Sequence, residues 1–85
     1  MPRSLTIQRS TVPSAEREKY LERLTARRSH YLASSCRFWV FEEIALPGAF
    51  IEFTEADDDA VLSNAHEGAP HLVLDPARIY REMEF

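Results

Sequence analysis

The sequence predicts an α+β domain in which an antiparallel sheet carries two helices on one face. Two observations support this fold class. Segments in which apolar and polar residues alternate with a period of two occur at both ends of the chain, aromatic-rich segments flank a Pro-Gly connection in the middle, and segments with helical spacing separate them. The chain has 85 residues, of which 45% are hydrophobic and 28% charged, as is typical of one globular domain. We therefore expect a single domain over residues 1–85.

The first part of the chain is predicted to form a strand and then a helix. Residues 4–12 place Leu5 and Ile7 on one face and more polar neighbours on the other, and Pro13 cannot continue a central strand. Helical spacing then predicts a helix over about 15–33. Its apolar side gathers Tyr20, Leu21, Leu24, Tyr31 and Leu32.

The middle of the chain is predicted to form a β-hairpin. Residues 36–43 and 49–55 are rich in aromatic and β-branched side chains, and a short connection with Pro47 and Gly48 separates them. The turn residues favour a hairpin, although this connection does not define the pairing register.

The last part of the chain is predicted to form a short helix and a closing strand. The run Asp57–Asp59 precedes residues 60–67, which have helical spacing, and Gly68 can end that helix. Residues 69–77 are compatible with helix, strand or loop, whereas residues 78–85 alternate as a strand does. The expected order is β-α-β-β-α-β, that of a ferredoxin-like fold.

Both faces of the predicted hairpin carry large apolar side chains. Two helices can cover only one face of the sheet, and an uncovered apolar face is typical of an interface. We therefore expect a homodimer in which a second copy covers the other face. In the first strand of the hairpin Cys36, Phe38 and Val40 would point to one side and Trp39 and Phe41 to the other. In the second strand Phe50 would point away from Ile51 and Phe53.

The chain resembles the dimeric α/β-barrel superfamily and, within it, the antibiotic-biosynthesis-monooxygenase-like domains. The matching stretches are RSTVPSAEREKYLERL at 9–24, the hairpin and second helix at 36–66, and RIYREMEF at 78–85. The resemblance implies a dimeric α/β barrel whose ligand cavity lies between sheet and helices. The superfamily contains cofactor-free oxygenases, heme-degrading enzymes and isomerases, so the resemblance does not identify the reaction. Gln8 stands where heme-degrading relatives have Asn, which argues against that site.

Charged and titratable candidates for a small-molecule site lie on both predicted helices. Arg17 and Arg28 fall near the middle of the apolar side of the first helix, where a guanidinium could hold an anion or phenolate. The alternative is that they pair with acids of the second half. His66, late in the second helix, could act as a catalytic base, or be favoured there by the helix dipole alone.

Aromatic candidates complete the predicted site. Trp39 could stack on a flat substrate or fill the dimer core. The hydroxyls of Tyr20, Tyr31 and Tyr80 could orient a phenolic ligand or bond to local partners. We interpret the chain as a small-molecule-binding protein, in its most specific form a cofactor-independent monooxygenase acting on an aromatic or apolar metabolite. The alternative is a non-enzymatic dimeric binding or structural protein.

Charge and cysteine content argue against other functional classes. Residues 1–37 hold eight Lys or Arg and three Glu, whereas residues 38–77 hold nine Asp or Glu and no Lys or Arg. Because the net charge is −4, we expect the two halves to pair with each other and expect no nucleic-acid partner. Cys36, the single cysteine, is expected in the core, and we expect no metal and no cofactor. No stretch is long and apolar enough to span a membrane, and a cytoplasmic location is expected.

Overall fold

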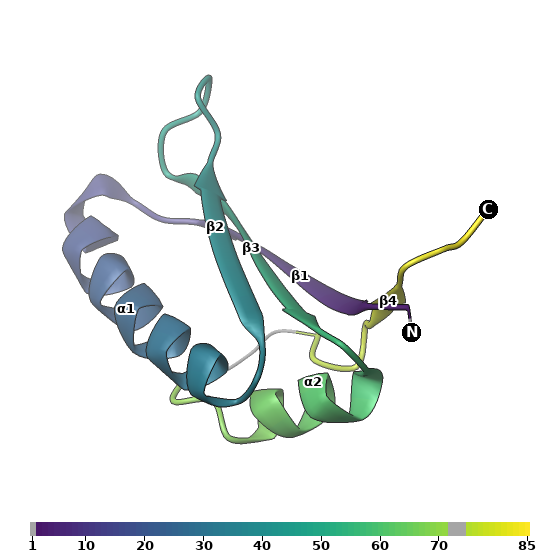
Figure 1. The fold of residues 1–85 in the computed structure, drawn as a ribbon. Helices are drawn as coiled ribbons and strands as arrows, with labels where there is room; N and C mark the ends of the chain where they lie inside the picture. Colours follow the sequence, from purple (N-terminus) through teal and green to yellow (C-terminus); the bar gives the residue numbers. More distant parts are fainter. Residues whose placement is uncertain (1, 72–74) are drawn as a thin grey trace.

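The computed structural model describes residues 2–71 and 75–85, which form a four-stranded antiparallel sheet with two helices on one face (Figure 1). The predicted element order is confirmed. The elements are β1 (Ser4–Thr11), α1 (Arg17–Ala33), β2 (Arg37–Glu42), β3 (Ala49–Ala56), α2 (Asp59–Glu67) and β4 (Tyr80–Arg81), with a short 3-10 helix (Ser14–Glu16) before α1.

The strands lie in the order β2-β3-β1-β4. Because β1 and β2 both run antiparallel to β3, they are parallel to each other with β3 between them. In the same way β3 and β4 flank β1. This interleaving of two β-α-β units is that of a ferredoxin-like fold, which confirms the predicted fold class.

The closing strand is shorter than predicted. The alternating residues 78–85 predicted a strand, but only Tyr80–Arg81 pairs with the start of β1. The amide of Glu82 makes one further backbone hydrogen bond, at 2.8 Å. Beyond it the chain runs past the beginning of β1, where this sheet has no strand to pair with, and Met83 and Phe85 are exposed.

Residues 69–77 divide into two described parts. Residues 69–71 and 75–77 form neither helix nor strand, and the prediction for 72–74 lies outside the described residues. Within the described part of the chain, no helix combines the length and the apolar character needed to cross a membrane.

Helix α2 begins within the predicted aspartate run. The side chain of Asp58 accepts a hydrogen bond from the amide of Val61 at 2.8 Å, which caps the first turn. Leu62 and Ala65 are buried against the sheet, and Cys36 belongs to the same core cluster, as expected from its residue type.

The strand register shows that the two faces of the sheet differ in polarity. One face lies under the helices, and we call it the covered face. It carries mostly polar residues along β1 and β3: Ser4, Thr6, Gln8, Ser10, Glu52 and Thr54. The opposite face, which we call the open face, is covered by no helix in the described part of the chain. Its apolar residues are Leu5, Ile7, Trp39, Phe41, Ile51 and Phe53.

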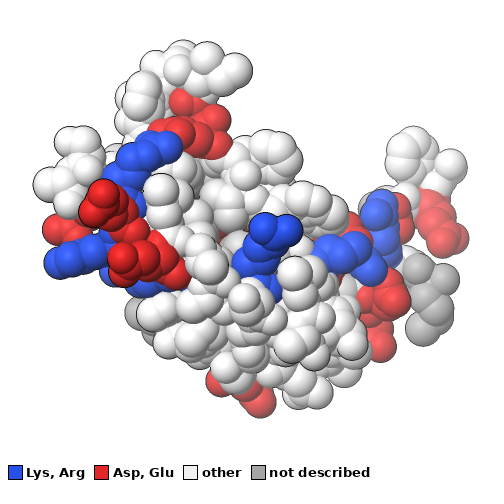
Figure 2. All heavy atoms as spheres, turned by 60° about the vertical axis from the view of Figure 1, so that its left-hand side comes forward, with Lys and Arg blue, Asp and Glu red and all other residues white. Residues whose placement is uncertain are grey.

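Basic residues of the first half pair with acidic residues of the second half within this chain. Figure 2 shows basic and acidic side chains beside one another on the surface rather than in separate fields. The uneven charge distribution along the sequence is therefore compensated by folding, as expected. The exposed or half-exposed pairs include Arg3–Glu55 at 3.3 Å, Arg17–Glu42 at 2.6 Å and Arg37–Asp57 at 2.9 Å.

Candidate functional site

A cluster of polar side chains, which we call the polar cluster, lies buried between the covered face and the helices. Arg27 of α1 and Glu52 of β3 are 6% and 2% exposed and form an ion pair, with Nη1 3.1 Å from Oε1. The hydroxyl of Tyr20 donates to Oε2 of Glu52 at 3.0 Å, and Arg27 Nη2 donates to Gln8 at 3.4 Å. A buried ion pair is tolerated because each charge compensates the other.

His66 forms the second half of the polar cluster. Its Nδ1 lies 2.8 Å from the hydroxyl of Tyr31, and its Nε2 lies 2.7 Å from the hydroxyl of Thr6. Burial, assisted by the charges of Arg27 and His30, lowers the pKa of His66 below its ordinary 6.5. The imidazole is therefore neutral at pH 7, with one nitrogen donating and the other accepting.

Burial also governs the other titratable groups of the polar cluster. It raises the pKa of Tyr20 to about 12 and raises the pKa of Tyr31, so both hydroxyls keep their protons at neutral pH. Burial raises the pKa of Glu52 as well, although Arg27 and Tyr20 favour the carboxylate. The polar cluster thus combines one ion pair with neutral groups that can both donate and accept hydrogen bonds.

Arg27 was not among the predicted site residues, although the helical spacing identifies it. It lies seven residues after Tyr20 and four before Tyr31, so the three side chains share one face of α1. Arg28, the neighbour that was predicted instead, lies at the surface. The apolar side of α1 is also narrower than predicted, because Leu21 and Leu32 are 44% and 54% exposed.

A groove of about 510 Å³ lies between α1 and the edge strand β2. Its volume is within the range of small-molecule sites, about 300–1,000 Å³. Phe38 in the groove stacks on Tyr31 of the polar cluster, with ring centroids 5.3 Å apart. The groove also brings together two predicted site residues from different elements. It is lined by Leu21, Leu24, Thr25, Arg28, Phe38, Trp39 and Val40.

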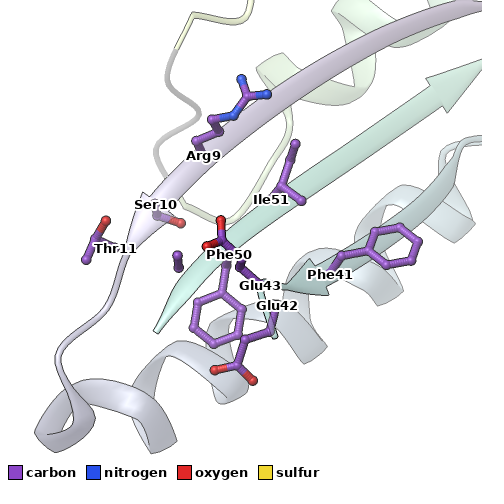
Figure 3. Close-up of a pocket in the computed structure, with 9 residues that line it drawn as sticks. Arg9, Ser10, Thr11, Phe41, Glu42, Glu43, Phe50 and Ile51 are labelled. Carbon is purple, nitrogen blue, oxygen red and sulfur yellow. The ribbon is translucent and has the colours of Figure 1, made fainter. Parts of the chain in front are cut away.

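A second hollow, of about 520 Å³, lies at the hairpin end of the sheet. Figure 3 shows that its lining side chains point in different directions, with Ile51 and Phe41 on one side of the strands and Phe50 on the other. The carboxylate of Glu42, another lining residue, accepts two hydrogen bonds from Arg17, at 2.6 and 2.9 Å. Because its polar groups do not converge, we assign no ligand to this hollow.

Arg17 and Tyr80 lie outside both the polar cluster and the groove. Arg17 pairs with Glu42 and lies over the ring of Phe50, with Cζ 5.4 Å from the ring centroid. The ion pair, together with the amide of Gly48, lowers the pKa of Glu42 to about 2. Tyr80 is exposed on β4.

The predicted site residues therefore fall into three groups. Tyr20, Tyr31 and His66 meet in the polar cluster, Arg28 and Trp39 line the groove, and the other two lie elsewhere. Among the residues that the structure describes, no group of three or more His, Cys, Asp or Glu side chains is placed to hold a metal ion.

Comparison with known proteins shows a shared fold. No family model matches the chain, and no curated protein matches it. The structure is similar to that of Rv0793 from Mycobacterium tuberculosis, with a TM-score of 0.64 and 16% sequence identity; the alignment covers 100% of this chain and 96% of that chain. At this identity the likeness shows that the two chains share the α+β, ferredoxin-like fold and nothing more specific.

Proposed function

We propose that this protein is a homodimer that binds an apolar or aromatic small molecule in the groove between α1 and β2. The observation that carries the proposal is the position of the groove. Most of the residues that line it are apolar, and Phe38 connects it to the polar cluster through the stacked ring of Tyr31. Sites for small molecules typically combine such an apolar wall with a few well-placed polar groups.

The composition of the groove favours a flat ligand with an acidic substituent. Leu21, Leu24 and Val40 supply apolar contacts, Phe38 supplies a ring, and Arg28 is the charged lining residue. A guanidinium binds phenolate or carboxylate oxygens through planar donors. Arg27 is less suited to this role, because Glu52 already compensates its charge.

Titration of Trp39 emission with a panel of flat phenols and anthrones tests binding. We expect saturable quenching by at least one compound, because the single tryptophan, Trp39, lies on the edge strand β2 and borders the groove, although its side chain belongs to the open face. Leu21→Glu should weaken that binding at least tenfold, whereas Leu32→Glu, on the same helix but outside the groove, should not. Absence of quenching, or equal effects of the two variants, would contradict the proposal.

A second candidate function is cofactor-independent oxygenation of the bound phenol. The neutral imidazole of His66 favours it, because such a group accepts protons near neutral pH. Both nitrogens are already hydrogen-bonded, Nδ1 to the buried Tyr31 hydroxyl at 2.8 Å and Nε2 to Thr6 at 2.7 Å, so His66 would take a proton only from a phenol that reaches the polar cluster and displaces one of these partners. Dioxygen uptake that accompanies ligand consumption would support this function. His66→Gln should then lose turnover but keep quenching; turnover that survives in His66→Gln would contradict it.

The open face supports the homodimer. Its six apolar side chains are contiguous across β1, β3 and β2, and Phe41 and Phe53 contact edge to face with centroids 5.8 Å apart. Exposed apolar surface of this kind is typical of an interface. Sedimentation equilibrium at micromolar concentration should give twice the monomer mass, and a monomer mass would contradict this part of the proposal.

We further propose that the chain belongs to the dimeric α/β-barrel superfamily, in its antibiotic-biosynthesis-monooxygenase-like group, and is cytoplasmic. The interleaved strand order and the apolar open face support the superfamily. The single cysteine, Cys36, which is buried and free, is consistent with a reducing compartment.

A further inference from the structure

We propose that the polar cluster binds one water molecule between Arg27 and Glu52. A cavity of about 10 Å³ lies inside the cluster, close to the volume that one water needs. Both charged side chains line it, together with polar groups from β1, β3 and α2. The full lining is Thr6, Ile7, Gln8, Arg27, Glu52, Thr54 and His66.

Two buried polar atoms, each belonging to a residue that lines this cavity, have no hydrogen-bond partner in the described part of the chain. They are Nε of Arg27, a donor, and Oε1 of Glu52, an acceptor. Nη1 of Arg27 lies 3.1 Å from Oε1 as an ion-pair contact, but Oε1 accepts no aligned hydrogen bond. Buried polar groups are rarely left in this state, because an unpaired group loses its hydration without compensation.

The residues that line the cavity favour a neutral molecule that can both donate and accept hydrogen bonds. The charges of Arg27 and Glu52 cancel, and His66 is neutral, so a cation would be repelled by Arg27 and an anion by Glu52. An apolar occupant would leave both polar atoms unpaired. Water can accept from Nε, donate to Oε1 and use the hydroxyls of Thr6 and Thr54 for further bonds, within the usual two to four partners.

This inference is independent of the proposed function, because it concerns the free protein and the interior of the polar cluster. A crystal structure at about 1.5 Å resolution tests it directly. We expect one ordered water within hydrogen-bond distance of Arg27 Nε and Glu52 Oε1. A cavity without density, or one closed by direct contact of the two side chains, would overturn the inference.

A matched pair of variants tests the same inference in solution. Thr54→Ile adds apolar volume at the cavity, whereas Thr54→Ser keeps the hydroxyl. Oxygen-17 magnetic relaxation dispersion detects long-lived internal waters. We expect Thr54→Ile to lose one such water relative to the natural protein and Thr54→Ser to lose none. Equal dispersion in all three proteins would overturn the inference, and the crystal structure decides the case if Thr54→Ile does not fold.

Discussion

The two faces of the sheet differ in how polarity and burial are combined along the central strands. The covered face places Thr6, Glu52 and Thr54 under the helices, whereas the open face leaves Trp39 and Phe41 43% and 56% exposed. Buried polar groups are stable only when they have hydrogen-bond or charge partners. An apolar surface, in contrast, is stabilised by any contact that removes it from water. The comparison therefore supports the proposed division, in which a ligand binds beside the covered face and a second copy binds the open face.

Removing one charge from the polar cluster at the covered face should have the largest effect. Arg27→Met leaves the carboxylate of Glu52 buried without its partner, and we expect the free energy of unfolding to fall by about 3–5 kcal/mol. Urea unfolding at one fixed protein concentration measures this change, since association would add to the apparent stability.

The control for this substitution is Arg23→Met, at an exposed position of the same helix, which should change stability by less than about 0.5 kcal/mol. The double variant Arg27→Met/Glu52→Leu should recover part of the loss, because neither charge then remains buried. Equal stability of Arg27→Met and Arg23→Met would show that the polar cluster does not depend on its ion pair.

A charge on the open face should disrupt association rather than folding. Phe41→Glu places a carboxylate within the proposed interface, and we expect the dimer dissociation constant to rise about a hundredfold, equivalent to about 2.7 kcal/mol. Leu32→Glu is a matched control, because Leu32 is 54% exposed, close to the 56% of Phe41, but lies on a helix. Sedimentation velocity over a concentration series measures the dimer dissociation constant of each variant. A similar increase in the two variants would count against an interface on the open face.

The smallest effect should be a pH dependence of stability that arises from His66 in the polar cluster. The pKa of His66 is lower in the folded protein than in the unfolded chain, so the unfolded chain takes up a proton first as the pH falls. The contribution of His66 to the free energy of unfolding should therefore be complete above about pH 6.5. Below that pH it should fall by at most about 1.4 kcal/mol per pH unit, until the pH passes the pKa of His66 in the folded protein.

His66→Gln should lack this contribution, and unfolding curves of both proteins between about pH 5 and pH 8 give the difference. The raised pKa of Glu52 acts in the opposite direction, above its ordinary value of 4.5, but it is common to both proteins. Parallel pH profiles would show that His66 does not titrate differently in the folded state.

The sequence predicted the elements of this fold well, because each has a local signature. Alternation identified β1, and aromatic content with a Pro-Gly connection identified the hairpin. Within each strand the sequence also showed which residues share a face, since successive strand side chains point to opposite sides. Asp58 and Gly68 marked the ends of α2. The extent of β4 was not predicted, because pairing depends on where β1 begins and not on the alternation of 78–85 itself.

The site was predicted only in part. Tyr20, Tyr31 and His66 were identified from residue type and meet in the polar cluster, but Arg28 was proposed in place of Arg27. Arg27 and Arg28 are neighbours in the sequence. The predicted apolar side of α1 was wider than the observed one, so it did not distinguish between them. Glu52 was not among the predicted site residues, because a strand residue gives no local sign that it will meet a helix cation.

The amino-acid sequence by itself determined the order of the elements and which residues of each strand share a face. It also showed that the hairpin has more large apolar side chains than two helices can cover. These follow from local periodicity and from composition. Only the tertiary structure decided that the helices cover the polar face and that Arg27, Glu52 and His66 meet beneath them. That choice depends on contacts between residues far apart in the chain, where pairing of buried polar groups outweighs the preference of any single segment.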